Sequence, residues 1–210
     1  MKIQKYVVGL YGVNCYIVFD EESGEAIVID PGENASEIYK YIESNNLKVK
    51  YILLTHGHFD HIGGVEELRK LTQAKIAISK EDSPMLLNEN LNLSEMVYKK
   101  ILCSPADILL NDGDTLSFGK YRVEVIHTPG HTKGGVCFKI GNVCFTGDTL
   151  FKGSIGRYDF PGGDFATLMD SIKNKLLVLG DDVLIYPGHG DSSTIGNEKR
   201  LNMFLRDLME

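Results

Sequence analysis

The sequence predicts an α/β (α+β) protein that folds as an αββα sandwich, in which two β-sheets pack together and helices cover their outer faces. Two observations indicate this class. Short runs rich in Val, Ile, Tyr and Phe alternate with longer amphipathic segments, and glycine or proline separates them. The same order, a β-rich stretch and then alternating strands and helices, occurs in both halves of the chain. Two sheets with helices outside are the simplest way to bury the apolar faces of all these elements.

The first part of the chain is predicted to form three strands, a helix and a fourth strand. The strands are expected at 2–8, 13–19, 25–30 and 51–55. Residues 21–24 form the turn of a hairpin between the second and third strands. Pro31-Gly32 ends the third strand, and a helix capped by Asn34 or Ser36 runs to about residue 46. The fourth strand is apolar, which is typical of a strand buried on both faces.

The rest of the chain is predicted to add helices and a second set of strands. Helices are expected at about 64–72, 83–102, 165–178 and 197–208, and Pro84 suits the first turn of the second of these. Strands are expected at 75–79, 107–110, 115–118, 121–127, 135–140, 143–147 and 182–186. Asp112-Gly113 and Gly141-Asn142 mark turns between strands.

The length and composition fit one domain that spans residues 1–210. The 43% hydrophobic and 24% charged residues are typical of soluble globular domains. We expect a cytoplasmic protein without a membrane partner, because no run of about 18 apolar residues and no secretory signal is visible. The net charge of −7 argues against binding to nucleic acid. The 4 cysteines form no C-x-x-C pair and are expected to be reduced, several of them buried in strands.

Three of the 6 histidines lie within the segment His56-Gly-His-Phe-Asp-His61, directly after a predicted buried strand. Roughly three in ten thousand chains of this length and composition would contain H-x-H-x-D-H by chance. His56 and His58 are two residues apart, so extended backbone can direct both side chains to the same side. Imidazole and carboxylate are ligands for Zn, Fe, Mn or Co, and sites of α/β proteins gather at strand ends. The segment therefore predicts a metal site.

This motif resembles the signature of the metallo-β-lactamase superfamily, and three further motifs follow in the expected order. They are His127-Thr-Pro-Gly-His131, Thr146-Gly-Asp148 and Pro-Gly-His189. The resemblance implies a four-layer αββα metallo-β-lactamase sandwich with two mixed sheets. It also implies two divalent ions, with zinc as the first choice and iron or manganese as alternatives. His56, His58 and His131 would hold one ion, Asp60, His61 and His189 would hold the other, and Asp148 would bridge them. His127 is left over, and we expect it to be structural or to support a metal ligand.

Residues 146–164 and 194–205 resemble the short bacterial members of the glyoxalase II-like branch of this superfamily. The branch implies hydrolysis of S-acyl thioesters such as S-lactoylglutathione by a hydroxide that bridges the two ions, which Asp60 could orient. The ions leave the site positive, so we expect a small anionic acyl-thioester substrate. Lys152 and Arg157 are the residues we expect to bind its carboxylate. Full-length glyoxalase II enzymes add a C-terminal helical domain that binds glutathione. The present chain ends soon after His189, so glutathione and another thiol carrier both stay open.

Other activities fit the same motifs. A persulfide dioxygenase of this branch would use one iron held by His56, His131 and Asp148. A phosphodiesterase or nuclease would usually carry a basic RNA-binding arm, and the sequence shows no insertion of that kind. A non-catalytic metal-binding module would need the ligands but no open coordination position.

Overall fold

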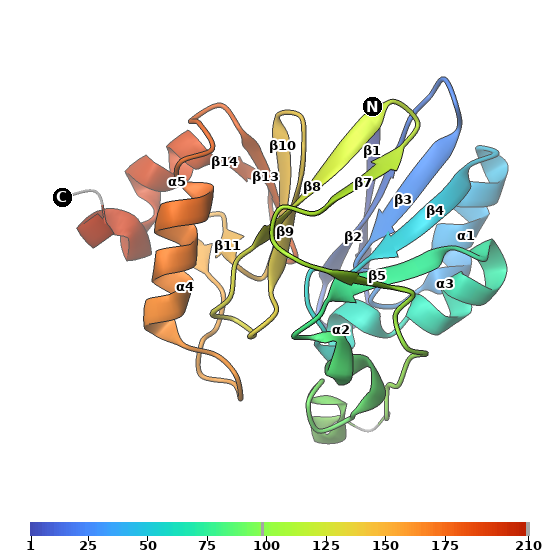
Figure 1. Ribbon diagram of the computed structural model, residues 1–210, viewed down its shortest axis with the longest axis horizontal. Coiled ribbons are helices and arrows are strands. Elements are labelled where there is room, and N and C mark those ends of the chain that lie inside the picture. Colours follow the sequence, from blue (N-terminus) through green and yellow to red (C-terminus); the bar gives the residue numbers. More distant parts are fainter. Residues whose placement is uncertain (98, 209–210) are drawn as a thin grey trace.

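Two β-sheets pack face to face and helices cover both outer faces, which confirms the predicted αββα sandwich (Figure 1). The computed structural model describes residues 1–97 and 99–208. Among these residues, no helix has the length and apolar character needed to cross a membrane. Several of the loops that join strands to helices lie at the lower edge of Figure 1, near the short helix α2 (Phe59–Ile62).

The first sheet is mixed and has the strand order β1-β2-β3-β4-β5-β6. Its first three strands are antiparallel, and β3 to β6 run parallel to one another. The strands are β1 (Lys2–Val8), β2 (Val13–Phe19), β3 (Glu25–Ile29), β4 (Lys48–Leu53), β5 (Lys75–Ser79) and β6 (Ile108–Leu110). The carboxyl ends of β3 and β4 meet at one edge, so the loops after them are neighbours.

The second sheet is also mixed and has the order β14-β13-β10-β9-β8-β7. Only β10 and β13 are parallel, and the other neighbours are antiparallel. Its strands are β7 (Thr115–Phe118), β8 (Tyr121–His127), β9 (Val136–Ile140), β10 (Val143–Gly147), β13 (Leu184–Pro187) and β14 (Ser193–Thr194). A small hairpin of β11 (Leu150–Phe151) and β12 (Ser154–Ile155) follows β10.

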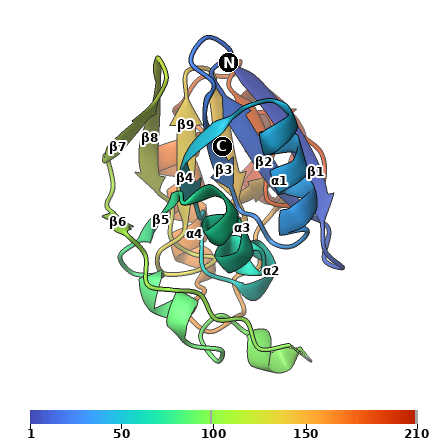
Figure 2. The same ribbon diagram turned by 90° about the vertical axis from the view of Figure 1, so that its right-hand side faces the viewer.

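Helices form the two outer layers. The first sheet is covered by α1 (Ala35–Ser44) and α3 (Val65–Thr72), which lie in front of it in Figure 2. The second sheet is covered by α4 (Phe165–Ser171), which continues as a π-helix over Ile172–Leu176, and by α5 (Ile195–Leu201). Within the described residues, 3₁₀-helices lie at η1 (Ser83–Leu87), η2 (Ser94–Met96) and η4 (Met203–Leu208).

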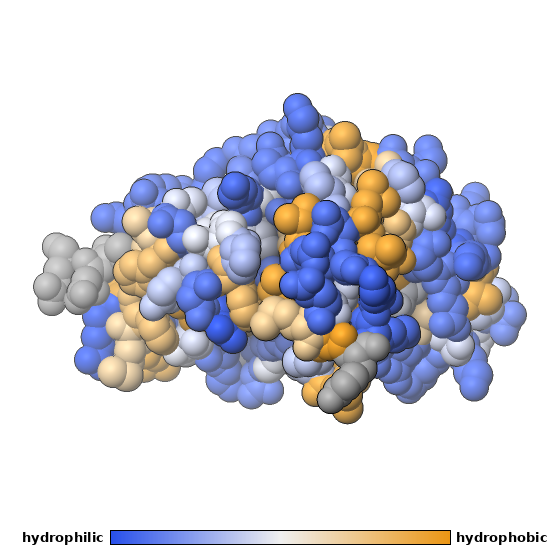
Figure 3. All heavy atoms as spheres, turned by 90° about the horizontal axis from the view of Figure 1, so that it is seen from below, coloured by the Kyte–Doolittle hydropathy of each residue, from blue (hydrophilic) through white to orange (hydrophobic). Residues whose placement is uncertain are grey.

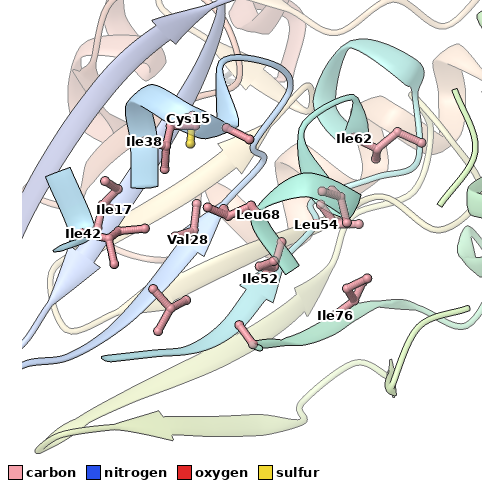
Figure 4. Close-up of a cluster of buried hydrophobic side chains, with 14 of the residues drawn as sticks. Cys15, Ile17, Val28, Ile38, Ile42, Ile52, Leu54, Ile62, Leu68 and Ile76 are labelled. Atoms are coloured by element: carbon pink, nitrogen blue, oxygen red, sulfur yellow. The ribbon is translucent and has the colours of Figure 1, made fainter. Parts of the chain in front are cut away.

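Three separate apolar layers hold the sandwich together, because successive side chains of a strand point to opposite faces. In β2, Cys15 and Ile17 point outward to the helices, whereas Tyr16 and Val18 point inward to the second sheet. Figure 4 shows the outer layer between the first sheet and its helices, where Ile38 and Leu68 lie over the strand residues. A third layer joins the second sheet to α4 and α5. The four cysteines are free and buried, as expected.

The prediction of an amphipathic helix over 83–102 is wrong. In the described part of this segment the structure has only η1 and η2, joined by turns, and Tyr98 lies outside the described residues. Asparagine side chains explain the break, since they compete with the helical hydrogen bonds of the backbone. Asn88 Oδ1 accepts from the Asn90 amide, and Asn92 Oδ1 accepts from the Ser94 amide. Leu93 has a φ of 67°, a left-handed conformation that no continuous helix contains.

The helix expected over 197–208 is shorter than predicted for the same reason. It begins at Ile195 and ends at Leu201, and η4 follows. Asn202 interrupts it, because its Oδ1 accepts from the Phe204 amide while its Nδ2 donates to the Ser154 carbonyl. The strand expected at 51–55 begins earlier, at Lys48, and ends at Leu53. Asn34 occupies the N-cap position of α1, but its side chain makes no capping hydrogen bond.

Candidate metal centre

The seven predicted ligand residues lie together in the structure, on loops that follow strands of both sheets. His56, His58, Asp60 and His61 follow β4 of the first sheet and run into α2. From the second sheet, His131 follows β8, Asp148 follows β10 and His189 follows β13. The carboxyl ends of the parallel strands β10 and β13 coincide, which places Asp148 beside His189. Strand ends of both sheets thus meet at one site.

One cluster consists of His56, His58 and His131. Each offers a ring nitrogen, and these atoms lie within 4.8 Å of one another. His58 Nδ1 is 3.0 Å from His131 Nε2. All three residues are buried, with at most 5% of their surface exposed. These are the three histidines that the resemblance assigns to one ion.

A second cluster consists of Asp60, His61 and His189, whose ligand atoms also lie within 4.8 Å of one another. His61 Nε2 is 3.3 Å from His189 Nε2. Asp148 lies between the two clusters: its Oδ1 is 3.4 Å from His61 Nε2, and its Oδ2 is 3.6 Å from His131 Nε2. This is the position that a bridging carboxylate requires.

The donor set fits divalent cations. Among the residues that the structure describes, the buried atoms His56 Nε2 and Asp148 Oδ1 have no hydrogen-bond partner. Such unpaired polar atoms cost free energy unless a ligand binds them. Five imidazoles this close would also repel one another if all were protonated. Three nitrogen donors in one cluster and a mixed nitrogen and oxygen set in the other suit Zn²⁺, Fe²⁺ or Mn²⁺.

Hydrogen bonds orient three of the imidazole rings toward the clusters. His131 Nδ1 donates to the Arg157 carbonyl at 2.7 Å, and His189 Nδ1 donates to the Tyr11 carbonyl at 3.1 Å. His61 Nδ1 lies 3.0 Å from Asp30 Oδ2. In each case Nε2 remains free to face the cluster, an arrangement typical of metal-bound histidines.

Asp30 is a site residue that the sequence analysis missed. It is buried at the end of β3, and its carboxylate also accepts from the amide and the hydroxyl of Thr55, at 2.8 and 2.6 Å. It therefore fixes both the start of the His56–His61 segment and the ring of His61. The available signal was its position directly before Pro31, at the end of a strand parallel to β4.

Two more buried polar residues hold the ligand loops. Asn14 of β2 donates through Nδ2 to the Pro187 and Gly190 carbonyls on either side of His189. Asp82 accepts from the Thr132 hydroxyl and from the Gly134 amide, at 2.7 and 2.8 Å, which fixes the loop that carries His131. Neither residue belongs to a recognisable motif in the sequence.

The pKa values of the histidines differ between the clusters. Burial and the neighbouring imidazoles hold the pKa of His56 well below its usual value, and burial beside His131 lowers the pKa of His58 to about 3. Burial also opposes the charge on His61, but nearby carboxylates, Asp148 first among them, outweigh it and raise the pKa to about 10. The protein alone therefore holds neutral His56 and His58 but a protonated His61 at pH 7.

We expect zinc binding to the Asp60–His61–His189 cluster to release at least one proton per chain at pH 7, because His61 must lose its proton to become a ligand. Burial opposes the charge on His189, but Asp60 and Asp148 outweigh it and raise its pKa, which adds to the release. The affinity of this cluster should rise at least about tenfold per pH unit between pH 7 and 10, where the metal competes with the proton of His61. Titration calorimetry in two buffers with different ionisation enthalpies measures the released protons. Zinc binding without proton release would contradict this assignment of the charge.

Of the two residues expected to bind substrate, the structure places one at the cavity beside the clusters and the other outside it. Arg157 lines the cavity beside the clusters, but its Nε and Nη2 donate to the two carboxylate oxygens of Asp159, at 2.9 and 2.8 Å. Lys152 is not in the lining and donates to Asp191 Oδ2 at 3.1 Å. His127 does not contact a predicted ligand through its ring; its Nε2 donates to the Lys133 carbonyl, in the loop that carries His131.

A cavity of about 470 Å³ opens onto both clusters. Five of the ligand residues line it: His58, Asp60, His131, Asp148 and His189. His56 and His61 lie deeper and are almost completely buried. A small molecule in the cavity can therefore reach both clusters at once, and the volume is in the range of ordinary small-molecule sites.

Comparisons with known proteins identify similar sequences and structures. The family model described as Metallo-beta-lactamase superfamily matches residues 8–189. Hydroxyacylglutathione hydrolase GloC from Haemophilus influenzae is 41% identical over 213 residues, which cover 98% of each chain. The BLEG-1 B3 metallo-beta-lactamase structure has a TM-score of 0.93 at 35% identity and covers 98% of this chain and 100% of that one. TTHA1623 in a di-iron-bound form has a TM-score of 0.84 at 34% identity, with 96% and 100% coverage.

Proposed function

The chain belongs to the metallo-beta-lactamase superfamily, and from this membership and its site we propose that it is a two-metal hydrolase of S-acyl thioesters. The observation that carries the proposal is the pair of His/Asp clusters joined by Asp148 at the floor of an open cavity. The similarity to GloC supports a thioester substrate. Zinc is the proposed metal, with iron or manganese as alternatives, since a similar protein holds two irons.

Seven residues of the chain would hold the metal ions, and one of them, Asp60, would also orient the attacking water. His56, His58 and His131 would hold one ion, Asp60, His61 and His189 the other, and Asp148 both. Bound there, the ions supply a Lewis acid for the carbonyl oxygen and lower the pKa of water toward 7. Asp60 lines the cavity; burial opposes the charge on its carboxyl, but interactions with His61 and His189 outweigh it and lower the pKa, so the group is ionised at pH 7. Its carboxylate can then accept a hydrogen bond from the attacking water and orient it.

A covalent mechanism finds no support in the cavity. None of the four cysteines lines it, and all four are buried. Ser154 is the one serine of the lining among the described residues, and its hydroxyl donates to the Ile155 carbonyl rather than to a histidine. A serine nucleophile needs a base within hydrogen-bond distance. Direct attack by water on the thioester carbonyl is therefore the mechanism we propose.

The proposal predicts that purified protein contains up to two metal ions per chain and hydrolyses S-lactoylglutathione or another S-acyl thioester. Removing the metal with a chelator should lower the rate at least a hundredfold, because hydrolysis then loses its polarising ions. Zinc added back should restore it. Metal analysis and thiol release on the same sample measure both quantities. An unchanged rate in protein shown to be free of metal would exclude this mechanism.

A mononuclear persulfide dioxygenase is the second candidate, because its three expected ligands, His56, His131 and Asp148, also lie together. The second cluster argues for the hydrolase, since Asp60, His61 and His189 would have no metal to bind in a one-iron site. Oxygen uptake with glutathione persulfide on the same sample separates the two. Rapid uptake with one iron per chain, and no thioester hydrolysis, would favour the dioxygenase.

A further inference from the structure

The cavity beside the metal clusters has apolar walls from two parts of the chain. Figure 3 views the molecule from the side of these loops and shows hydrophobic side chains on both sides of a hydrophilic group near the middle of that face. The apolar lining residues of the two walls are Leu93, Met96 and Val97 in and around η2, and Phe151, Ile155 and Phe160 after β10. Such walls bind groups that leave water readily and offer nothing to a charged one.

In the described lining, no cationic side chain is free of an ion pair to receive a substrate carboxylate. Arg157 is the one Lys or Arg in the described lining, and its Nε and Nη2 already donate to the two carboxylate oxygens of Asp159, which balances its charge. Its guanidinium carbon lies 4.0 Å from the centre of the Phe160 ring, which holds the side chain flat against that wall. A substrate carboxylate could pair with Arg157 only by sharing its charge with Asp159, at the remaining Nη1 edge, or by displacing Asp159.

Such a pairing would gain little binding free energy. Asp159 would keep its charge beside the incoming carboxylate, and two like charges at close range repel. Glutathione carries two carboxylates, and the described lining offers an unpaired cationic side chain to neither.

In place of the small anionic substrate expected from the sequence, we propose that the preferred substrate is an uncharged thioester with an apolar acyl chain. Thioesters of glutathione are then poorer substrates. This inference rests on the proposed thioester hydrolysis and names the chemical class that the same site selects. The acyl chain lies against the wall of Leu93, Met96 and Val97, while the carbonyl lies over the clusters. Each buried methylene should raise kcat/KM about fourfold until the wall is covered.

Four thioesters test the inference on metal-loaded protein: lactoyl and hexanoyl esters, each of glutathione and of the neutral thiol N-acetylcysteamine. We expect hexanoyl-N-acetylcysteamine to have the highest kcat/KM, at least about tenfold above S-lactoylglutathione. The non-hydrolysable thioether S-hexyl-N-acetylcysteamine should inhibit competitively and more tightly than S-hexylglutathione. Fastest hydrolysis of S-lactoylglutathione would overturn this inference but leave the proposed function standing. Failure of all four esters would overturn both.

Met96→Glu places a carboxylate on the apolar wall and should lower the hexanoyl-to-lactoyl ratio of kcat/KM about tenfold. Met203→Glu is the matched control, since Met203 has 68% exposure, close to the 70% of Met96, and lies in η4 outside the cavity lining. The control should leave the ratio unchanged. Equal ratios in both variants would contradict the placement of the acyl chain.

Asp159→Asn tests the second half of the inference by releasing Arg157. This variant should improve kcat/KM for glutathione thioesters about two- to fivefold relative to the neutral thioesters, because an exposed ion pair is worth little more than that. No relative gain would show that Asp159 does not withhold Arg157 from the substrate, and this part of the inference would fail.

Discussion

Asp148→Ala is expected to abolish metal binding and hydrolysis together, with kcat/KM at least about a thousandfold lower. Asp148 stands between the two clusters, 3.4 Å from His61 Nε2 and 3.6 Å from both His131 Nε2 and His189 Nε2. Without its carboxylate, both ions lose a negative ligand, and the neighbouring histidines face one another across a gap. Metal content per chain and thiol release from the same preparation provide the two measurements.

The control for Asp148→Ala is Asp181→Ala. Asp181 is an exposed carboxylate paired with Lys199, outside the cavity lining, so its removal should leave metal content and rate at wild-type values. Circular dichroism of both variants separates loss of metal from loss of fold. A correctly folded Asp148→Ala protein that keeps two ions and full activity would refute the bridging role.

Gly188→Ala should be nearly as damaging, although glycine coordinates nothing. A Cβ atom at this position would lie 2.3 Å from Asp148 Oδ1 and 2.7 Å from His61 Cε1. Both contacts are far shorter than van der Waals distances, so one of the two ligand side chains must move. A displacement of about 1 Å at a reacting centre costs about a hundredfold in rate. We expect that loss in kcat/KM, together with weaker metal binding in a competition titration.

Gly190→Ala is the matched control for this effect. Gly190 lies in the same loop and has a φ of 76°, so alanine strains the backbone there, but its Cβ would meet no atom within 4 Å. The control should cost about 1 kcal/mol of folding stability and keep its metal. Equal metal loss in both variants would show that loop strain, and not the clash with the ligands, is the cause.

The ligand residues could be predicted because they lie in short sequence motifs that can be recognised without the structure. A dense His/Asp motif directly after an apolar strand identifies both the residue types and their place at a strand end. Asp30, Asn14 and Asp82 could not be found in this way. Each is a single polar residue whose role comes from partners distant in sequence, such as Thr55, Pro187 and Thr132. Their function depends on the pairing of strands, which a local pattern does not specify.

The strands were predicted more accurately than the segments 83–102 and 197–208. Most strands are short runs rich in Val, Ile, Tyr and Phe between turn residues, and most strand ends lie within one or two residues of the expected positions. The 83–102 segment has apolar residues at helical spacing, but Met85, Leu86 and Leu93 are buried individually between asparagine turns. Periodicity alone does not detect that Asn88 and Asn92 bond to the backbone in place of a helical turn.

Both clusters draw side chains from the two halves of the sandwich: His56 and His58 face His131, and Asp60 and His61 face His189. A cation in either cluster would therefore crosslink the two halves. This crosslink can form only when the two halves are assembled. Cleavage at the Asp112-Gly113 turn would divide these donors between two fragments. Neither fragment alone would retain a complete set, so tight metal binding would report that the fragments had reassembled.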